Sequence, residues 1–302
     1  MTDLEKHVAR NKKLDGLFAI VGLLSTFIGM LTLAALIINL AIDGAVRLTP
    51  HFFTSFPSRF PAQAGILSAW VGTTLVMVVT ALTAVPMGIA AGVYLEEYAP
   101  KNWLTALIEI NIANLAGVPS IVYGLMALGL FVYQLKLGQS ILSAGLTLAL
   151  LILPIVIVAT RESIRAVPGS MREAAYALGA TKWQTTRDHV LPYSMGGILT
   201  GVIIALSRAI GETAPLVTIG ALTFIAFLPD APVKGEFPFL SFDWLMSPFT
   251  VMPIQMFNWV SRPQQEFHLN AAATGLVLMV MTLIMNGIAI YFRYRFRKRI
   301  KW

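Results

Sequence analysis

The sequence predicts an all-α membrane protein with six transmembrane helices. Hydrophobic residues make up 57% of the 302 residues and charged residues only 12%, against roughly 25% charged residues in soluble domains. The apolar residues also gather in six long stretches, each able to cross about 30 Å of hydrocarbon. A soluble globule needs more polar surface than this, and a disordered chain contains fewer apolar residues.

The six predicted spans are apolar stretches with almost no charge. The first is about twice as long as a signal-peptide core, so we expect an uncleaved helix. Four later spans contain a proline, which a packed bundle tolerates because neighbouring helices satisfy the freed backbone groups. The stretches are Leu17–Ile42, Ile66–Leu95, Ile110–Leu135, Leu137–Thr160, Tyr193–Leu228 and Leu269–Phe292, and the prolines are Pro86, Pro119, Pro154 and Pro215.

The basic residues predict the orientation of these spans. Sixteen of the 22 lysines and arginines fall in residues 1–16, 95–108, 161–192 and 293–302, which six spans place on one face. Because cytoplasmic loops are rich in Lys and Arg, we expect this face and both termini to be cytoplasmic. The net charge of +7 is then explained by topology and anionic lipid, and no nucleic-acid partner is needed.

The long outer loop, Pro229–His268, contains eight aromatic residues, among them Trp244 and Trp259. We interpret them as an aromatic belt at the membrane interface. The alternative is that the loop forms part of a docking surface for an external partner.

Several kinds of chemistry are excluded by what the sequence lacks. The chain has no cysteine, and its four histidines are scattered without the spacing of metal ligands; we therefore predict no metal site. It has no G-x-x-x-x-G-K-[ST] pattern, so no phosphate loop of that kind binds ATP. We expect no catalytic residues and no cofactor in this chain.

The predicted cytoplasmic loop, residues 161–192, contains signals for two short helices. Ser170 and Glu173 form an S-x-x-E capping box that predicts a helix start, and Gly179 is placed to end that helix by a left-handed cap. A second capping box, Thr181 with Gln184, predicts another short helix.

The first of these helices has an apolar face of small residues. Its members recur at helical spacing and are Met171, Ala174, Ala175 and Leu178. Such a face either packs on the membrane domain or inserts into the groove of a partner, and the physics alone does not choose between them.

Two charged residues interrupt the fifth span. Arg208 and Glu212 are four residues apart, a spacing that places both side chains on one helix face. An ionisable group inside a membrane is a functional-site hypothesis. One interpretation is a neutral ion pair that locks two helices together. The other is an anion pathway, in which the guanidinium offers a fork of donors to an oxyanion and Glu212 prevents permanent trapping or accepts a proton carried by the substrate.

The loop motif resembles a known pattern. Glu173-Ala174-Ala175, Gly179 and Leu191-Pro192 match the EAA loop of ABC importer permeases, E-A-A-x3-G-x9-I-x-L-P, in register, although His189 stands where the pattern prefers Ile. The resemblance implies that these six residues belong to a coupling helix that inserts into a cytoplasmic ATPase subunit, and that the fold has the MetI-like architecture of such permeases.

The fifth span sharpens the resemblance. The segments Arg208–Leu216, Leu115–Gly124 and Pro86–Tyr98 are similar to those of PstA-type permeases of bacterial phosphate ABC importers. The resemblance implies that Arg208 and Glu212 take part in phosphate passage. Thr213 of the same motif is a further pathway candidate. The polar residues of the third span could line the same path or make interhelical hydrogen bonds instead; they are Asn111, Asn114, Ser120 and Tyr123.

The family also implies partners and a location. We expect a second related permease, two copies of an ATPase subunit that uses ATP and Mg, an external phosphate-binding protein in the periplasm or outside the cell, and membrane lipid. The chain would be a multi-pass protein of the bacterial plasma (inner) membrane. Residues 1–16 would form a cytoplasmic segment, residues 17–292 the permease domain and residues 293–302 a basic cytoplasmic tail.

Other functions stay open from the sequence. The first alternative is an ABC permease for another oxyanion or an organic solute, with the same coupling loop. A self-sufficient secondary transporter or channel would need no ATPase. A membrane enzyme finds no support, because no acid–base, metal or nucleophile set is clustered in the sequence.

Overall fold

The computed structural model describes residues 3–231 and 241–299, and these form helices and irregular segments without a β-strand. In this part of the chain, five helices are long and apolar enough to cross a membrane. A sixth crossing results if the bent pair α4 and α5 counts as one span. The predicted all-α membrane fold is therefore confirmed. The long helices are α1 (Asp3–Ala45), α3 (Leu67–Val93), α6 (Ile141–Arg165), α9 (Leu191–Ala209) and α12 (Gln265–Arg299).

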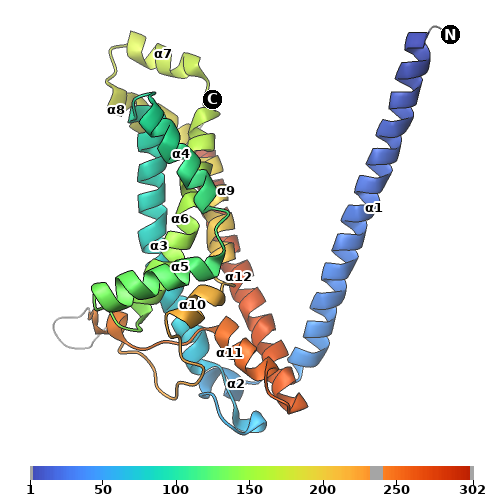
Figure 1. The fold of residues 1–302 in the computed structure, drawn as a ribbon, viewed down its shortest axis with the longest axis vertical. Helices are drawn as coiled ribbons and strands as arrows, with labels where there is room; N and C mark the ends of the chain where they lie inside the picture. Colours follow the sequence, from blue (N-terminus) through green and yellow to red (C-terminus); the bar gives the residue numbers. More distant parts are fainter. Residues whose placement is uncertain (1–2, 232–240, 300–302) are drawn as a thin grey trace.

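Shorter elements connect the long helices. Figure 1 shows α7 and α8 at one end of the bundle and α2 and α11 at the opposite end. Helix α1 begins at the end of the bundle that holds α7, and α12 runs from the opposite end toward that end. The short helices are α2 (Pro50–Thr54), α4 (Trp103–Leu115), α5 (Ser120–Ala127), α7 (Gly169–Ala177), α8 (Lys182–Thr185), α10 (Ala214–Thr218) and α11 (Met252–Val260), and the short turns used below are the π-helical η2 (Tyr94–Tyr98), η3 (Leu128–Gln134) and η4 (Thr186–Val190).

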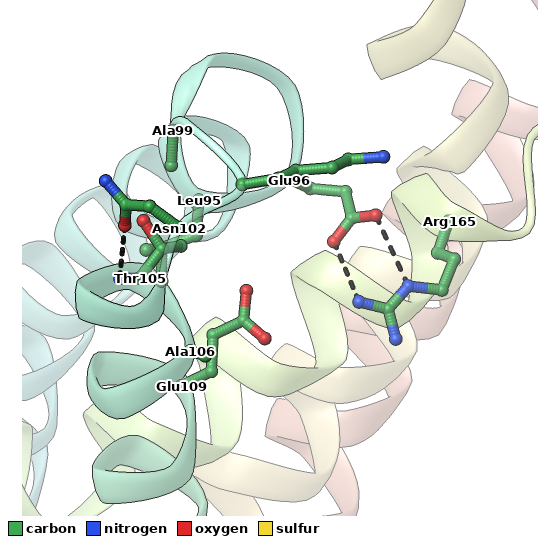
Figure 2. A pocket seen from close by; sticks show the side chains of 9 residues that line it. Leu95, Glu96, Ala99, Asn102, Thr105, Ala106, Glu109 and Arg165 are labelled. Carbon is green, nitrogen blue, oxygen red and sulfur yellow. Dashed lines mark hydrogen bonds and ion pairs between the residues drawn. The ribbon is translucent and has the colours of Figure 1, made fainter.

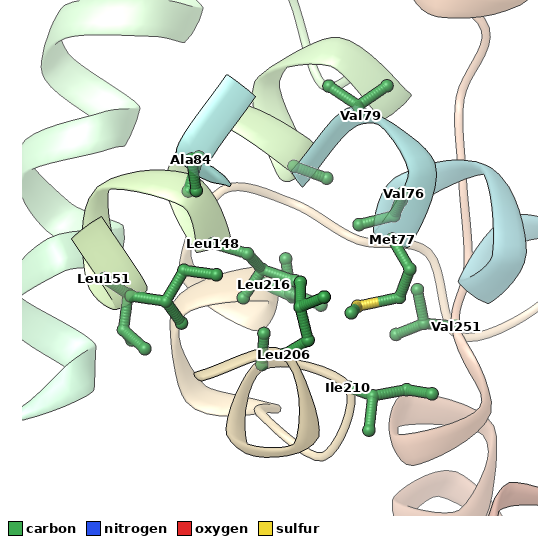
Figure 3. Close-up of a cluster of buried hydrophobic side chains, with 14 of the residues drawn as sticks. Val76, Met77, Val79, Ala84, Leu148, Leu151, Leu206, Ile210, Leu216 and Val251 are labelled. Atoms are coloured by element: carbon green, nitrogen blue, oxygen red, sulfur yellow. The ribbon is translucent and has the colours of Figure 1, made fainter. Parts of the chain in front are cut away.

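Helices α3 and α6 form the centre of the bundle, and glycines bring them together. A Cβ added at Gly88 would lie 2.6 Å from Cγ1 of Val156, and one at Gly92 would lie 2.6 Å from Cβ of Thr160. Small residues let membrane helices approach closely, so that van der Waals contact and backbone proximity hold them together. The main apolar core is built from side chains of this pair together with side chains of α9 and α10 (Figure 3).

Helix α1 differs from the rest because it stands apart over most of its length (Figure 1). Its apolar side chains are exposed from Leu17 to Leu36. The helix meets the bundle only near its C-terminal end, where a Cβ added at Gly44 would lie 2.8 Å from the backbone of Ala272 and Ala273 in α12. An apolar surface of this kind is stable in lipid, which is as apolar as the side chains themselves.

The tryptophans expected in an aromatic belt lie in the interior instead. Trp259 of α11 is fully buried and stacks on Phe267 of α12, with ring centroids 6.4 Å apart. Phe52 of α2 also packs on Trp259, with ring centroids 6.1 Å apart. Trp244 is buried as well. The belt interpretation is therefore wrong for these two residues: α11 folds back onto α12 and buries Trp259, whereas Trp244 belongs to the main apolar core. Residues 232–240 of this loop lie outside the described residues.

The third predicted span is bent at Pro119. Helix α4 ends at Leu115 and α5 begins at Ser120, and the two parts meet at 106°. A continuous helix would bring the proline ring against the carbonyl of Leu115, four residues earlier, and that carbonyl would find no N–H at position 119. The predicted span over Ile110–Leu135 is therefore formed by two helical parts with a sharp bend, and not by one continuous helix.

The fifth predicted span is also interrupted. Helix α9 ends at Ala209, and Pro215 lies in the first turn of α10. A helix that continued through Gly211 would again place a carbonyl against the ring of Pro215. After α10, Gly220 adopts a positive φ of 93° and the chain turns into an irregular segment. The predicted helix over Tyr193–Leu228 therefore stops well before its predicted end, and the chain beyond Pro215 does not complete a span.

Candidate functional site

The two interruptions lie against each other. Helix α5 packs on α10, and the approach is so close that a Cβ at Gly124 would lie 2.7 Å from Cα of Pro215. Figure 1 shows α5 crossing the bundle directly above α10. Spans that break near one another place non-helical backbone and polar side chains at membrane depth, which is where transporters build binding sites. We call this region the break site; its candidate residues are Asn114, Ser120, Tyr123, Arg208, Glu212 and Thr213.

Arg208 and Glu212 form an ion pair across the end of α9. The Nε of Arg208 donates to Oε1 of Glu212 at 3.3 Å. Arg208 occupies the last turn of α9, where a cation is favoured by the helix dipole. Glu212 lies beyond the helix, in the turn that leads to α10, so the predicted pairing is confirmed although the two residues do not share one continuous helix.

The pair leaves part of the guanidinium free. The Arg208 side chain is 43% exposed and that of Glu212 is 16% exposed. The two terminal amino groups of Arg208 have no partner among the described residues. Because a guanidinium presents its donors as a rigid planar fork, these groups can receive two oxygens of one anion while Nε stays on the carboxylate.

Tyr123 is buried and completes the bend between α4 and α5. Its hydroxyl donates to the carbonyl of Leu115 at 2.8 Å, the group that Pro119 leaves without a helical donor. Of the two roles left open for Tyr123, the structure supports a hydrogen bond within the bundle.

The other polar candidates of the break site lie on its surface. Asn114 is exposed at the end of α4, and Ser120 and Thr213 are half-buried at the starts of α5 and α10. None of their side chains has a hydrogen-bond partner among the described residues. Asn111 is set apart, because its amide donates to the carbonyl of Leu107 within α4.

Helix α7, the predicted coupling helix, divides its apolar face in two. Ala175 is buried and Met171 packs on a small cluster of Val93, Ile164 and Val190. The remainder of the face is bare, with Leu178 89% exposed, and Glu173 and Ala174 are exposed as well. One half of this face therefore packs on the membrane domain, as one of the two alternatives predicts, and the other half is left exposed.

The caps of the loop helices are only partly as predicted. Gly179 has a φ of 81°, and the N–H of Ala180 donates to the carbonyl of Ala175 at 3.1 Å, so the predicted left-handed cap is confirmed. The Thr181–Gln184 capping box is present. The Ser170–Glu173 box is wrong, because α7 already begins at Gly169 behind Pro168, and no side chain caps it.

The rest of the motif lies where the loop returns to the membrane domain. Leu191 packs on the same apolar cluster, and Pro192 lies in the first turn of α9. His189 is exposed in η4, and the buried contact of this segment comes from Val190. The departure from the motif at position 189 therefore leaves the packing of the loop intact.

An ion-pair network at the base of the loop was not anticipated. Arg161, which is buried, pairs with Glu109 of α4 at 2.7 Å, and Arg165 pairs with Glu96 of η2 at 3.1 Å. Arg172 of α7 pairs with Glu97 at 2.7 Å. Figure 2 shows Glu96, Glu109 and Arg165 around a cavity of about 350 Å³. The sequence signal was available: acidic residues follow the second span while basic residues dominate the loop after the fourth.

No metal site emerges from the described residues, in which no group of three or more His, Cys, Asp or Glu side chains could hold an ion.

Comparisons with known proteins agree with this architecture. Residues 84–301 match the family model described as binding-protein-dependent transport system inner membrane component. The fold is similar to solved inward-facing conformations of the MetNI methionine ABC transporter, with a TM-score of 0.54 at 14% identity, over 76% of this chain and 94% of that one.

Curated relatives extend over most of the sequence. The chain is 30% identical to the phosphate transport system permease protein PstA of Yersinia pestis over 96% of its own length and 93% of the relative. It is 31% identical to PstA 1 of Mycobacterium tuberculosis over 79% of its length and 72% of the relative. It is 34% identical to the probable ABC transporter permease protein YqgI of Bacillus subtilis over 63% of its length and 66% of the relative. The chain therefore belongs to the family of binding-protein-dependent transport system inner membrane components.

Proposed function

We propose that this chain is the membrane-spanning permease subunit of an ATP-driven phosphate importer and forms half of the translocation pathway. The observation that carries the proposal is the state of Arg208, whose Nε donates to Glu212 while its two terminal amino groups make no hydrogen bond within the described chain. Bidentate guanidinium pairs are a preferred way to bind phosphate oxygens. The phosphate permeases among the relatives support the same substrate.

Glu212 gives the site a preference among oxyanions. Phosphate near neutral pH still carries a proton, whereas sulfate does not. A carboxylate beside the guanidinium accepts a hydrogen bond from a protonated phosphate and repels a fully ionised anion. The same carboxylate competes for Arg208, so that the anion is released rather than held. An ABC permease for another oxyanion is the alternative; its pathway would not need this acceptor.

The energy for transport would come from other chains. We infer that the exposed half of α7, with Glu173, Ala174 and Leu178, docks on a separate ATPase subunit that binds ATP and Mg. A second related permease completes the pathway, and an external binding protein delivers phosphate. This arrangement requires the α7 end of the bundle, and with it both termini, to be cytoplasmic, which agrees with the excess of Lys and Arg there.

The test is phosphate uptake by membranes that contain the chain with its partner permease, ATPase and binding protein. Arg208→Gln keeps a polar, shorter side chain and removes the charge and the fork. We expect uptake to fall by at least about tenfold, equal to ~1.4 kcal/mol, with normal assembly of the complex. Arg59→Gln is the control, because Arg59 is exposed at the α11 end and should leave uptake unchanged.

Two outcomes would contradict the proposal. Undiminished uptake by Arg208→Gln would exclude an essential anion contact at the break site. Uptake that continues without ATP, or from the chain alone, would exclude an ATP-driven importer. Competition by excess sulfate separates the two substrate readings, since a phosphate site with a proton acceptor should be insensitive to it.

A further inference from the structure

The π-helical turn η2 at the end of α3 contacts the end of α6 and both short helices, α7 and α8, of the coupling loop. Three consecutive residues of η2 each contact a different one of these helices. Glu96 accepts two hydrogen bonds from Arg165 at the end of α6. Glu97 accepts two from Arg172 in α7. The ring of Tyr98 lies 5.1 Å beneath Nζ of Lys182 in α8.

The link between Glu97 and Arg172 is the most buried of the three. Glu97 is only 7% exposed and Arg172 is 20% exposed. Nε and Nη2 of Arg172 both donate to Oε1 of Glu97, at 3.1 and 2.7 Å. The same guanidinium donates to the carbonyls of Val167 at 2.9 Å and Ile164 at 3.1 Å. One side chain therefore joins α7 to the ends of both α3 and α6.

The remaining contact of α7 with the bundle is small and apolar. Met171 packs on the cluster around Ile164 and Val190, and Ala175 is buried. Apolar contact of this kind is non-directional, whereas a forked and buried ion pair fixes both distance and orientation. A displacement of α7 reaches α3 most directly through Arg172 and Glu97.

Helix α3 leads from this link into the centre of the molecule. It packs on α6 through glycines along its length, and both helices contribute to the core that also contains Leu216 of α10. The break site thus rests on the same two helices that η2 and Arg172 connect to the loop.

From this geometry we propose that Glu97 and Arg172 are positioning residues that couple the movement of α7 to α3, with η2 as the joint between the coupling loop and the transport pathway. This inference rests on the proposed function, because it assumes that α7 docks on an ATPase subunit. The inference gives η2, at the end of α3, a role in coupling that the EAA motif of the loop does not include.

The experiment measures phosphate transported per ATP hydrolysed by the complete complex in vesicles. The variants are Glu97→Gln, Arg172→Gln and the double variant, and the amount of ATPase subunit that co-purifies is measured for each. We expect each single variant to lower the transport-to-hydrolysis ratio by about fivefold or more, the lower end of typical coupling between sites, while the ATPase subunit still binds. Arg187→Gln is the control, since it removes an exposed pair with Asp188 in the same loop.

The double variant keeps the test decisive if a single variant fails to accumulate. Removing one partner leaves an uncompensated buried charge, whereas removing both leaves none. If the pair acts as one unit, the double variant should accumulate normally and be no more uncoupled than the worse single variant.

The results that would overturn the inference are clear. Ratios equal to the wild type in both single variants would do so, and so would a double variant whose defect equals the product of the two single defects. Failure of the proposed function looks different, because the wild-type complex would then show no ATP-driven phosphate uptake at all.

Discussion

Two pairs of proline-containing segments behave in opposite ways in this molecule. In the α3–α6 pair, Pro86 and Pro154 lie inside long helices that continue past them. In the pair made by α4–α5 and α9–α10, the helices end before Pro119 and Pro215. All four prolines lie in apolar stretches, so residue type alone does not decide whether a span breaks.

The residues before each proline differ between the two pairs. Gly117 precedes Pro119 by two residues and Gly211 precedes Pro215 by four, whereas the four residues before Pro86 and before Pro154 contain no glycine. Glycine lowers the preference for helix by about 1 kcal/mol and adds to the penalty of the following proline. The comparison separates two regions. The first is a close-packed frame made by α3 and α6, and the second is the break site, where the backbone leaves the helix and the charged candidates Arg208 and Glu212 lie.

The largest effect is expected in the frame. Gly92→Leu would place a side chain where even a Cβ comes within 2.6 Å of Thr160. We expect destabilisation of at least ~3 kcal/mol, the upper range of overpacking costs, measured as loss of monodisperse protein and a lower Tm in detergent. Gly29→Leu in α1 is the matched control, because nothing lies within 4 Å of its Cβ position. Equal stability of the two variants would show that close packing of α3 on α6 is dispensable.

An intermediate effect on transport is expected at the breaks. Pro215→Ala restores an N–H and removes the ring, so α9 gains freedom to continue through Glu212 and remove the break. We expect phosphate uptake to fall by about tenfold, equal to ~1.4 kcal/mol, with the complex intact. Pro154→Ala, in the frame, should stay within about twofold of the wild type, because proline already sits in a helix there and alanine favours that state. Equal uptake by both variants would remove the distinction between frame and break.

The sequence predicted the elements that depend on local patterns. Long apolar stretches predicted both ends of α3 and α6 to within five residues, and Gly179 and the Thr181–Gln184 box marked real helix ends. The pairing of Arg208 with Glu212 followed from spacing alone. The breaks did not follow, because a proline in a span is compatible with both a continuous and an interrupted helix, and a preceding glycine shifts that choice by only about 1 kcal/mol.

Long-range contacts explain the remaining differences. Trp259 was expected at the membrane interface, but α11 folds back onto α12 and buries it. Ser170 was expected to cap α7, but Pro168 starts the helix earlier. The link between Glu97 and Arg172 joins residues that are far apart in the chain, and no local pattern indicates which acidic residue meets which arginine.

The smallest effect is expected from a single hydroxyl in the α4–α5 bend. Tyr123→Phe removes the donor that reaches the carbonyl of Leu115, although the N–H of Val118 still donates to that carbonyl at 3.1 Å. Because the carbonyl of Leu115 still accepts this hydrogen bond, we expect the free energy of unfolding to fall by only about 1 kcal/mol, the usual net value of one hydrogen bond. The change should appear as a small fall in Tm, with uptake largely retained. Tyr133→Phe is the control, since its side chain is exposed in η3. A Tm equal to that of the control would show that the bend is set by Pro119 alone, whereas a loss of uptake at unchanged Tm would return Tyr123 to the pathway.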